Sequence, residues 1–251
     1  MTVRAVLQAR CSSQRFPRKV LADLHGAPML LRQLERLERA ERLDELVVAT
    51  STDPSDDELA TVLDSAQVAV HRGSLDDVLE RFADAAQGAD HVVRLTGDCP
   101  LACPATIDAL VERHLESNAD YTSNTLRRSY PIGLDAEVVT LKALTTAHRE
   151  ADLTSEREHV TPFLYKRPER FQLENLADSE NHSQLRWTVD EPVDLEFVRA
   201  VFAALYDANP AFNTADVLAL LEQRPELAAI NAGIEHSGYQ RSLEQDRRVE
   251  R

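Results

Sequence analysis

The sequence predicts an α/β protein with a mostly parallel sheet flanked by helices. Short apolar runs that suit strands alternate with amphipathic runs that suit helices through the first half of the chain. Such alternation is typical of parallel strands joined by right-handed crossovers. The length of 251 residues suits one large domain, which buries most of its unfolded surface without a disulfide or a structural metal.

Strands and helices follow one another in order up to about residue 116. The predicted strands are Val3–Gln8, Glu45–Thr50, Gln67–His71 and Asp90–Leu95. The predicted helices are Pro28–Ala40, Asp56–Ser65 with Ser55 as N-cap, Leu75–Ala86 and Pro104–Glu116. Because ligands collect at the carboxyl ends of parallel strands, the expected rim of a site consists of segments 8–10, 49–51, 71–73 and 96–98.

The alternation changes after about residue 120. Predicted strands at Asp120–Asn124, Leu134–Thr140 and Phe171–Leu176, with helices at Leu141–Ala151 and Glu156–Tyr165, indicate a small insertion with mixed or antiparallel strands over about residues 121–176. A strand at Arg186–Val189 and helices at Pro192–Tyr206 and Thr214–Glu222, the last capped by Asn213, complete the prediction. We expect one domain over residues 1–235 and a polar tail over 236–251.

The charge balance excludes one broad class of function. Forty-three acidic residues against 28 basic ones give a net charge of −15, whereas nonspecific nucleic-acid binding needs a basic surface. Genome composition or adaptation to salt is a sufficient explanation for the acidity itself. An acidic protein that handles a polyanionic ligand must nevertheless gather its cations locally and recruit a metal ion.

The sequence carries no signal for export or for membrane insertion. The N-terminal apolar run is short, and no stretch approaches the roughly 18 to 20 apolar residues of a membrane span. Cys11, Cys99 and Cys103 lack the spacing of a metal or redox motif and suit reduced thiols. We therefore expect a cytoplasmic protein that binds neither membrane nor nucleic acid.

A basic segment follows the first predicted strand. Residues 10–19 contain four cations, namely Arg10, Arg15, Arg18 and Lys19. Arginine offers a fork of donors to phosphate oxygens, and Ser12 and Ser13 can line an anion-binding loop with the backbone N–H groups. A solvated basic loop is the plainer alternative, but its place at the end of a strand favours a ligand. Neither a P-loop nor a glycine-rich dinucleotide turn occurs.

Two aspartates stand at the ends of predicted strands. Asp98 follows the strand that ends at Leu95, and Asp190 follows the one that ends at Val189. A carboxylate at this edge can hold Mg²⁺, although Asp98 also suits a turn or a cap. For Asp194, four residues further on, a favourable interaction with the helix dipole is a sufficient explanation. Two strand-end carboxylates and one basic loop are consistent with metal-assisted nucleotidyl transfer.

Eight segments make the interpretation more specific. In order, they read QARCSSQRFPRKVL, VVATS with PSDD, HRGSLDDVLERF, VVRLTGDCPL, DYTSNTL, YPIGLDAEV, EREHVTPF and RWTVDEPVDLE. The series resembles the SpsF-like branch, named for spore coat polysaccharide, of the CMP-sugar synthetase superfamily, which includes acylneuraminate and 3-deoxy-manno-octulosonate cytidylyltransferases. The resemblance covers roughly residues 3–205.

The resemblance implies a Rossmann-like fold of the GT-A nucleotide-diphospho-sugar transferase kind, CTP as donor, Mg²⁺ as cofactor and a homodimer formed through the inserted strands. Asp98 and Asp190 become the metal ligands. The nucleotide side that it implies consists of Arg10, Ser12, Ser13, Arg15 and Lys19 at the triphosphate and Arg72 near the base or ribose. The implied catalytic set is Arg10, Lys19, Asp98 and Asp190.

A sugar-like acceptor is expected at the insertion. Polar side chains there can read its hydroxyl groups, and Arg157 can pair with a carboxylate or a phosphate. The candidates are Asn124, Asp135, Glu137, Arg157, Glu158 and His159. An ordinary surface role is the alternative for each, and a structural role is the more usual one for His159.

The sequence thus predicts a cytidylyltransferase that moves CMP from CTP to a nonulosonic acid or a related sugar for surface glycan biosynthesis, with release of pyrophosphate. A GT-A glycosyltransferase that consumes a sugar nucleotide is the nearest rival. It would usually show a D-x-D motif where this chain has Gly97, Asp98 and Cys99. A catalytically inactive nucleotide-binding module is the third hypothesis.

Overall fold

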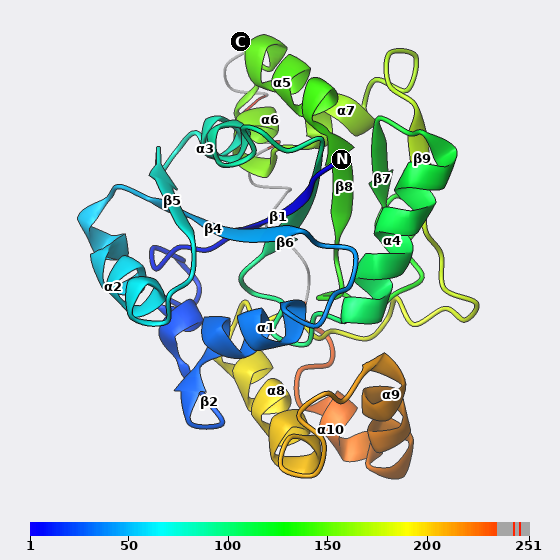
Figure 1. The fold of residues 1–251 in the computed structure, drawn as a ribbon. Coiled ribbons are helices and arrows are strands. Elements are labelled where there is room, and N and C mark those ends of the chain that lie inside the picture. Colours follow the sequence, from blue (N-terminus) through cyan, green and yellow to red (C-terminus); the bar gives the residue numbers. More distant parts are fainter. Residues whose placement is uncertain (235–242, 244–245, 247–251) are drawn as a thin grey trace.

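The fold is built on one central sheet. The computed structural model describes residues 1–234 together with residues 243 and 246, so the predicted tail of 236–251 lies almost wholly outside the described residues. The sheet has seven strands in the order β5-β4-β1-β6-β8-β7-β9 (Figure 1). In chain order they are β1 (Val3–Gln8), β4 (Glu45–Ser51), β5 (Val70–Gly73), β6 (His91–Thr96), β7 (Tyr121–Ser123), β8 (Glu137–Thr140) and β9 (Leu173–Asn175).

Helices cover both faces of the sheet (Figure 1). One face packs against α1 (Met29–Leu37), α2 (Asp57–Ser65) and α4 (Pro104–Ser117). The other packs against α3 (Val78–Ala85), α5 (Leu141–Glu150) and α7 (Pro162–Tyr165), and α6 (Thr154–His159) lies beside α3. A third apolar cluster unites α8 (Pro192–Leu205), α9 (Thr214–Gln223) and α10 (Pro225–Ala229) with the start of α1.

Successive side chains of β1 point to opposite faces of the sheet and belong to different apolar clusters. Ala5 and Leu7 are buried under α1, whereas Val6 is buried on the side of α3. Leu30 and Leu34 of α1 lie one helical turn apart and meet the first of these clusters. The α/β architecture with a mostly parallel sheet is therefore confirmed, because six strands run in one direction and β8 alone runs against its neighbours.

Several boundaries differ from the predictions for local reasons. Gln67 has a positive φ of 58° and forms a turn, so β5 begins only at Val70. Ser55 does not cap α2. Instead Asp53 caps a short 3-10 helix, η2 (Pro54–Asp56), and its side chain accepts the N–H of Ser55 at 2.9 Å. The helix α2 then begins at Asp57. Asn213 caps α9 as predicted.

The second half shows the larger differences. The single helix predicted over Glu156–Tyr165 is divided into α6 and α7, because Val160 has a φ of 72° and Pro162 begins a new helix. Segment 186–189 forms no strand but only one bridge, between Arg186 and Ile132. Its N–H groups bond to loops, as when Val189 donates to the carbonyl of Asp98 at 2.8 Å.

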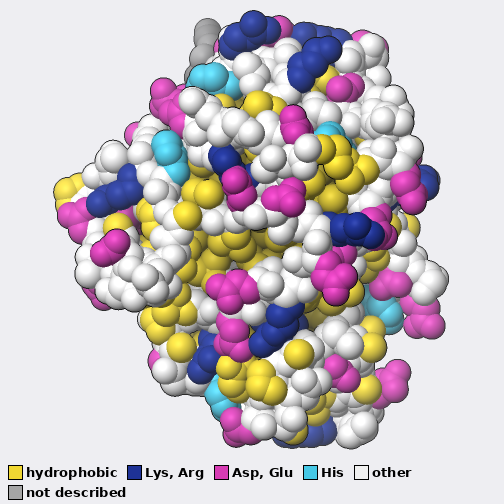
Figure 2. All heavy atoms as spheres, in the orientation of Figure 1, with side chains coloured by type: hydrophobic (Ala, Val, Ile, Leu, Met, Phe, Trp, Pro, Cys, Tyr) yellow, Lys and Arg dark blue, Asp and Glu magenta, His cyan; other side chains and the backbone are white. Residues whose placement is uncertain are grey.

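The predicted insertion is continuous with the main sheet. β8 pairs with β6, and β7 and β9 extend the sheet beyond it. Elements absent from the prediction are the 3-10 helix η1 (Lys19–Leu21), the small hairpin of β2 (Asp23–Leu24) and β3 (Ala27–Pro28), and α10. On the face drawn in Figure 2, acidic and basic side chains are interspersed. Within the described part of the chain, no helix has the length and apolarity that a membrane crossing requires.

Gly133 is expected to tolerate no side chain. Its φ is +108°, and a Cβ would lie 2.4 Å from the backbone nitrogen of Thr188. Gly88 has a φ of +91° with nothing within 4 Å of the same position. Gly133→Ala should lower the free energy of unfolding by about 3 kcal/mol, the sum of backbone strain and overpacking. Gly88→Ala, with strain alone, should cost about 1 kcal/mol in urea denaturation. An equal loss of stability in the two variants would contradict the close approach of Gly133 to the backbone of Thr188.

Candidate active site

A cleft of about 1190 Å³ lies at the carboxyl ends of β1 and β6. Residues 8–10 and 96–99 form part of its wall, as predicted for the rim, and Leu75 and Asp76 follow β5 along it. The end of β4 is different, because Thr50 and Ser51 are buried beneath the neighbouring turn. The sequence-predicted residues that line the cleft are Arg10, Ser12, Ser13, Arg15, Lys19, Asp98, Asp135, Glu137, Glu158, His159 and Asp190.

The basic loop is held at its base by a buried carboxylate. Asp56 is fully buried and accepts the N–H of Cys11 at 2.6 Å and that of Ser51 at 3.2 Å. The N–H of Arg18 donates to the carbonyl of Cys11 at 2.9 Å and closes the loop. Burial, with a smaller contribution from Asp56, raises the pKa of Cys11 to about 11, so this thiol is protonated and unreactive at neutral pH.

The two predicted metal ligands meet at one ammonium group. Lys19 Nζ lies 3.2 Å from Asp98 Oδ2 and 2.9 Å from Asp190 Oδ1, and it donates to the carbonyl of Val189 at 2.7 Å. Arg15 approaches the same oxygen of Asp190 at 2.9 Å. Lys19 and Asp190 are only 8% and 5% exposed, so these pairs are poorly screened by solvent.

These ion pairs dominate the ionisation of the cluster. Burial alone would lower the pKa of Lys19 and raise that of Asp98, but the opposite charges outweigh it, and the pKa of Lys19 is raised and that of Asp98 lowered. The Asp98 contribution to stability is therefore present above its ordinary pKa of about 4 and is lost as the pH falls through the lowered value. The Lys19 contribution is fully present below its ordinary pKa of about 10 and is lost as the pH rises through the raised value.

The far side of the cleft carries the predicted acceptor residues. Glu137 is bonded to Arg94 and accepts the hydroxyl groups of Tyr121 at 2.5 Å and Thr161 at 2.7 Å. Burial lowers the pKa of His159, so its ring is neutral at pH 7. A second ion pair lies on this side of the cleft, where Asp135 binds Arg128 through both carboxylate oxygens at 2.5 and 2.7 Å.

Three predicted site residues do not line the cleft. Arg72 donates to the carbonyl of Ser51 at 2.8 Å and to Asp57 at 2.7 Å, on the outer side of β4. Asn124 is 1% exposed, and its side-chain amide bonds to the backbone of residues 134 and 136. Arg157 is bonded to Asp77 at the start of α3 and to the end of α5. The structure thus gives these three side chains contacts within the fold.

The comparisons with known proteins identify the family of this chain. The sequence model described as cytidylyltransferase matches residues 4–215. The chain belongs to the cytidylyltransferase family. It is 33% identical over 245 residues to an uncharacterized protein of Methanocaldococcus jannaschii (95% of this chain, 98% of the other). It is 29% identical over 232 residues to the spore coat polysaccharide biosynthesis protein SpsF of Bacillus subtilis (89% and 95%).

A solved structure confirms the fold over almost the whole chain. The cytidylyltransferase of Leptospira borgpetersenii serovar Hardjo-bovis superposes with a TM-score of 0.88 at 29% identity, over 94% of this chain and all of the other. The resemblance found in the sequence is therefore confirmed, as are the fold and the activity class. This cytidylyltransferase is a CTP-dependent nucleotidyltransferase.

Sequence reasoning missed several residues that shape the cytidylyltransferase cleft. Asp56 lies in the segment PSDD, where the prediction made it the first residue of a helix capped by Ser55. Arg94 and Arg128 line the cleft and neutralise Glu137 and Asp135. Arg94 stands inside a strand, and only its position opposite Glu137 in the pairing of β6 with β8 reveals the contact.

The geometry at Asp98 and Asp190 fits a divalent cation. One cation already contacts both carboxylates, so the two side chains converge on a single position. Mg²⁺ commonly takes one or two carboxylates and completes its shell with water and substrate phosphate. Among residues 1–234, 243 and 246, no three metal-ligating side chains gather, so the substrate would have to supply oxygens in that shell.

Lys19 is expected to act as the resident cation of this pair. In Lys19→Met the two carboxylates lose it, and the free energy of unfolding at pH 7 should fall by about 3 kcal/mol. Millimolar Mg²⁺ should raise the melting temperature of this variant more than that of the wild type. Lys142→Met, at an exposed position of α5, is the control and should change neither quantity. A Lys19→Met protein of wild-type stability would contradict the assignment.

Proposed function

We propose that this chain transfers CMP from CTP to a sugar-like acceptor and releases pyrophosphate. The observation that carries the proposal is the convergence of Asp98 and Asp190 on one cation position, beside the basic loop and within a large cleft. A cation bound there neutralises charge on the phosphate oxygens and polarises the phosphorus that is attacked. We assign that cation as Mg²⁺.

The basic loop supplies the phosphate contacts in this proposal. Arg10, Ser12 and Ser13 face the cleft from the turn after β1. Arg15 and Lys19 are paired with Asp190, and with a metal ion held by the carboxylates both side chains could turn to the triphosphate. Fixed donors placed around the departing pyrophosphate would stabilise its developing charge without reorganisation.

The chemical step is an in-line displacement at the α-phosphorus. An acceptor oxygen forms the new bond to phosphorus, the bond to the bridging oxygen of the pyrophosphate breaks, and the acceptor proton passes to solvent. The acceptor lies on the side of Asp135, Glu137, Glu158 and His159, whose polar groups suit a polyhydroxylated molecule. Arg72, Asn124 and Arg157 have fixed contacts elsewhere, so we assign them supporting roles in place of direct substrate contacts.

The acceptor that we propose is a nonulosonic acid or a related sugar of surface glycan biosynthesis. The relative named for spore coat polysaccharide biosynthesis, which shares most of its length with this chain, supports that choice. A cytoplasmic location and a homodimer through the region 121–176 belong to the same proposal. The net charge of −15 supports a small-molecule substrate over nucleic acid.

The test is pyrophosphate release from each of the four NTPs with Mg²⁺ and a panel of acidic and phosphorylated sugars. We expect release with CTP and one class of acceptor. Asp98→Asn and Asp190→Asn should each lower turnover by about 100-fold or more, since each removes a charged ligand. Asp57→Asn, at a largely exposed carboxylate paired with Arg72, is the control and should keep wild-type turnover.

Two results would contradict the proposal. One is wild-type turnover in both Asp98→Asn and Asp190→Asn. The other is no release with any NTP, together with transfer of sugar from a preformed sugar nucleotide, which would identify a glycosyltransferase instead.

A further inference from the structure

Asp194 does more than cap α8. It is fully buried at the third position of the helix and accepts five hydrogen bonds. An ordinary capping box uses only one of them, the N–H of Glu191 at 2.9 Å. The N–H of Asp190 itself donates to the same oxygen at 2.9 Å. Asp194 therefore holds the backbone of the candidate metal ligand directly.

Arg186 connects the two carboxylates. Its Nε and one terminal nitrogen bind the two oxygens of Asp194 at 2.8 Å each, a bidentate geometry. The same terminal nitrogen lies 3.6 Å from Asp190 Oδ2. Lys19 and Arg15 approach the other oxygen, Oδ1. The Asp190 carboxylate is thus fixed at its backbone and faced by cations at both oxygens.

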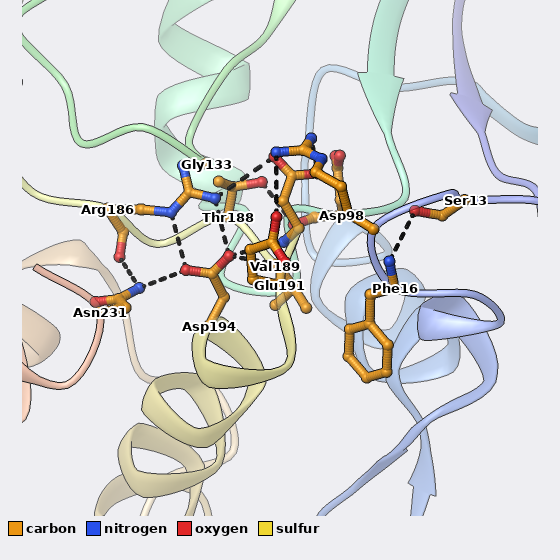
Figure 3. Close-up of polar contacts among 12 residues, drawn as sticks. Ser13, Phe16, Asp98, Gly133, Arg186, Thr188, Val189, Glu191, Asp194 and Asn231 are labelled. Carbon is orange, nitrogen blue, oxygen red and sulfur yellow. Dashed lines mark hydrogen bonds and ion pairs between the residues drawn. The ribbon is translucent and has the colours of Figure 1, made fainter. Parts of the chain in front are cut away.

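A residue from the C-terminal helices completes this network. Asn231 follows α10, is 3% exposed, and donates through its amide to Asp194 Oδ1 at 2.9 Å and to the carbonyl of Arg186 at 3.0 Å (Figure 3). The match to the family ends at residue 215. Asn231 thus lies beyond the segment that the family model matches, and one residue, Asp194, connects it to the backbone of Asp190.

We propose that Asp194, Arg186 and Asn231 are positioning residues that hold Asp190 in the orientation in which it binds a divalent cation. The inference rests on the proposed function, because it takes Asp190 as a metal ligand. Groups that orient a ligand set metal affinity, and their removal commonly costs 10- to 100-fold in affinity. The C-terminal helices of this chain are then coupled to the site through one buried amide.

The test is the affinity of the full-length chain for Mn²⁺ alone, measured from the electron paramagnetic resonance signal of the free ion. Asn231→Ala keeps every charge and should weaken Mn²⁺ binding about tenfold. Arg186→Lys keeps the positive charge but loses the bidentate geometry, and should weaken binding by about the same factor. Asn213→Ala is the control, since it removes the cap of α9 in the same C-terminal region without contacting Asp194.

The outcomes separate the two proposals. Weakened binding in Asn231→Ala, with wild-type affinity in Asn213→Ala at a comparable melting temperature, supports the positioning role. Wild-type affinity in a folded Asn231→Ala overturns it, and if that variant does not fold, wild-type affinity in Arg186→Lys overturns it. Asp190→Ala tests the assignment of Asp190 as a metal ligand, on which the positioning role rests. If Asp190→Ala also binds Mn²⁺ like the wild type, the metal assignment itself fails.

Discussion

Two carboxylates largely removed from water cannot both stay ionised side by side unless a cation balances them, and the rest of this site depends on that constraint. Asp98 follows the end of β6. Asp190 belongs to a segment much later in the sequence, which bonds to the loop after β6 through the N–H of Val189. Lys19 forms ion pairs with both carboxylates, which places the loop after β1 beside them. Three segments distant in sequence are joined there, and each carries a group that suits a phosphate or a metal ion.

The cation requirement also explains how a protein with a net charge of −15 can receive a polyanion. Part of its positive charge lies at the cleft, where Arg10, Arg15 and Lys19 follow one strand. Arg94 and Arg128 stand on the opposite wall, but each is paired with a carboxylate there. The phosphate side is therefore the more basic of the two, and the acceptor side is polar with more carboxylates than arginines. This asymmetry favours one orientation of a nucleotide in the cleft.

Much of this was predictable from the sequence, because periodicity and strand ends are local properties. The strand at 3–8 and the placement of Asp98 at the end of β6 follow from them. Asp190 reaches the same cleft from a segment that forms no strand, so the reason given for its position was wrong. What depends on distant contacts was not predictable. Gln67 was predicted to begin a strand but has a positive φ and lies in a turn before β5. Asp56 was predicted as the first residue of a helix but anchors the basic loop, and Arg157 was predicted to bind the acceptor but binds Asp77. Asn231 carries no local signal at all, because its role exists only through packing of the C-terminal helices.

The most direct test of the account is anomalous diffraction from crystals soaked with Mn²⁺ and CTP. The account predicts a strong manganese peak within coordination distance of Asp98 and Asp190, with Lys19 Nζ moved away from both carboxylates and toward the phosphates. A manganese ion bound elsewhere, with Lys19 still between the two carboxylates and CTP present in the cleft, would contradict it.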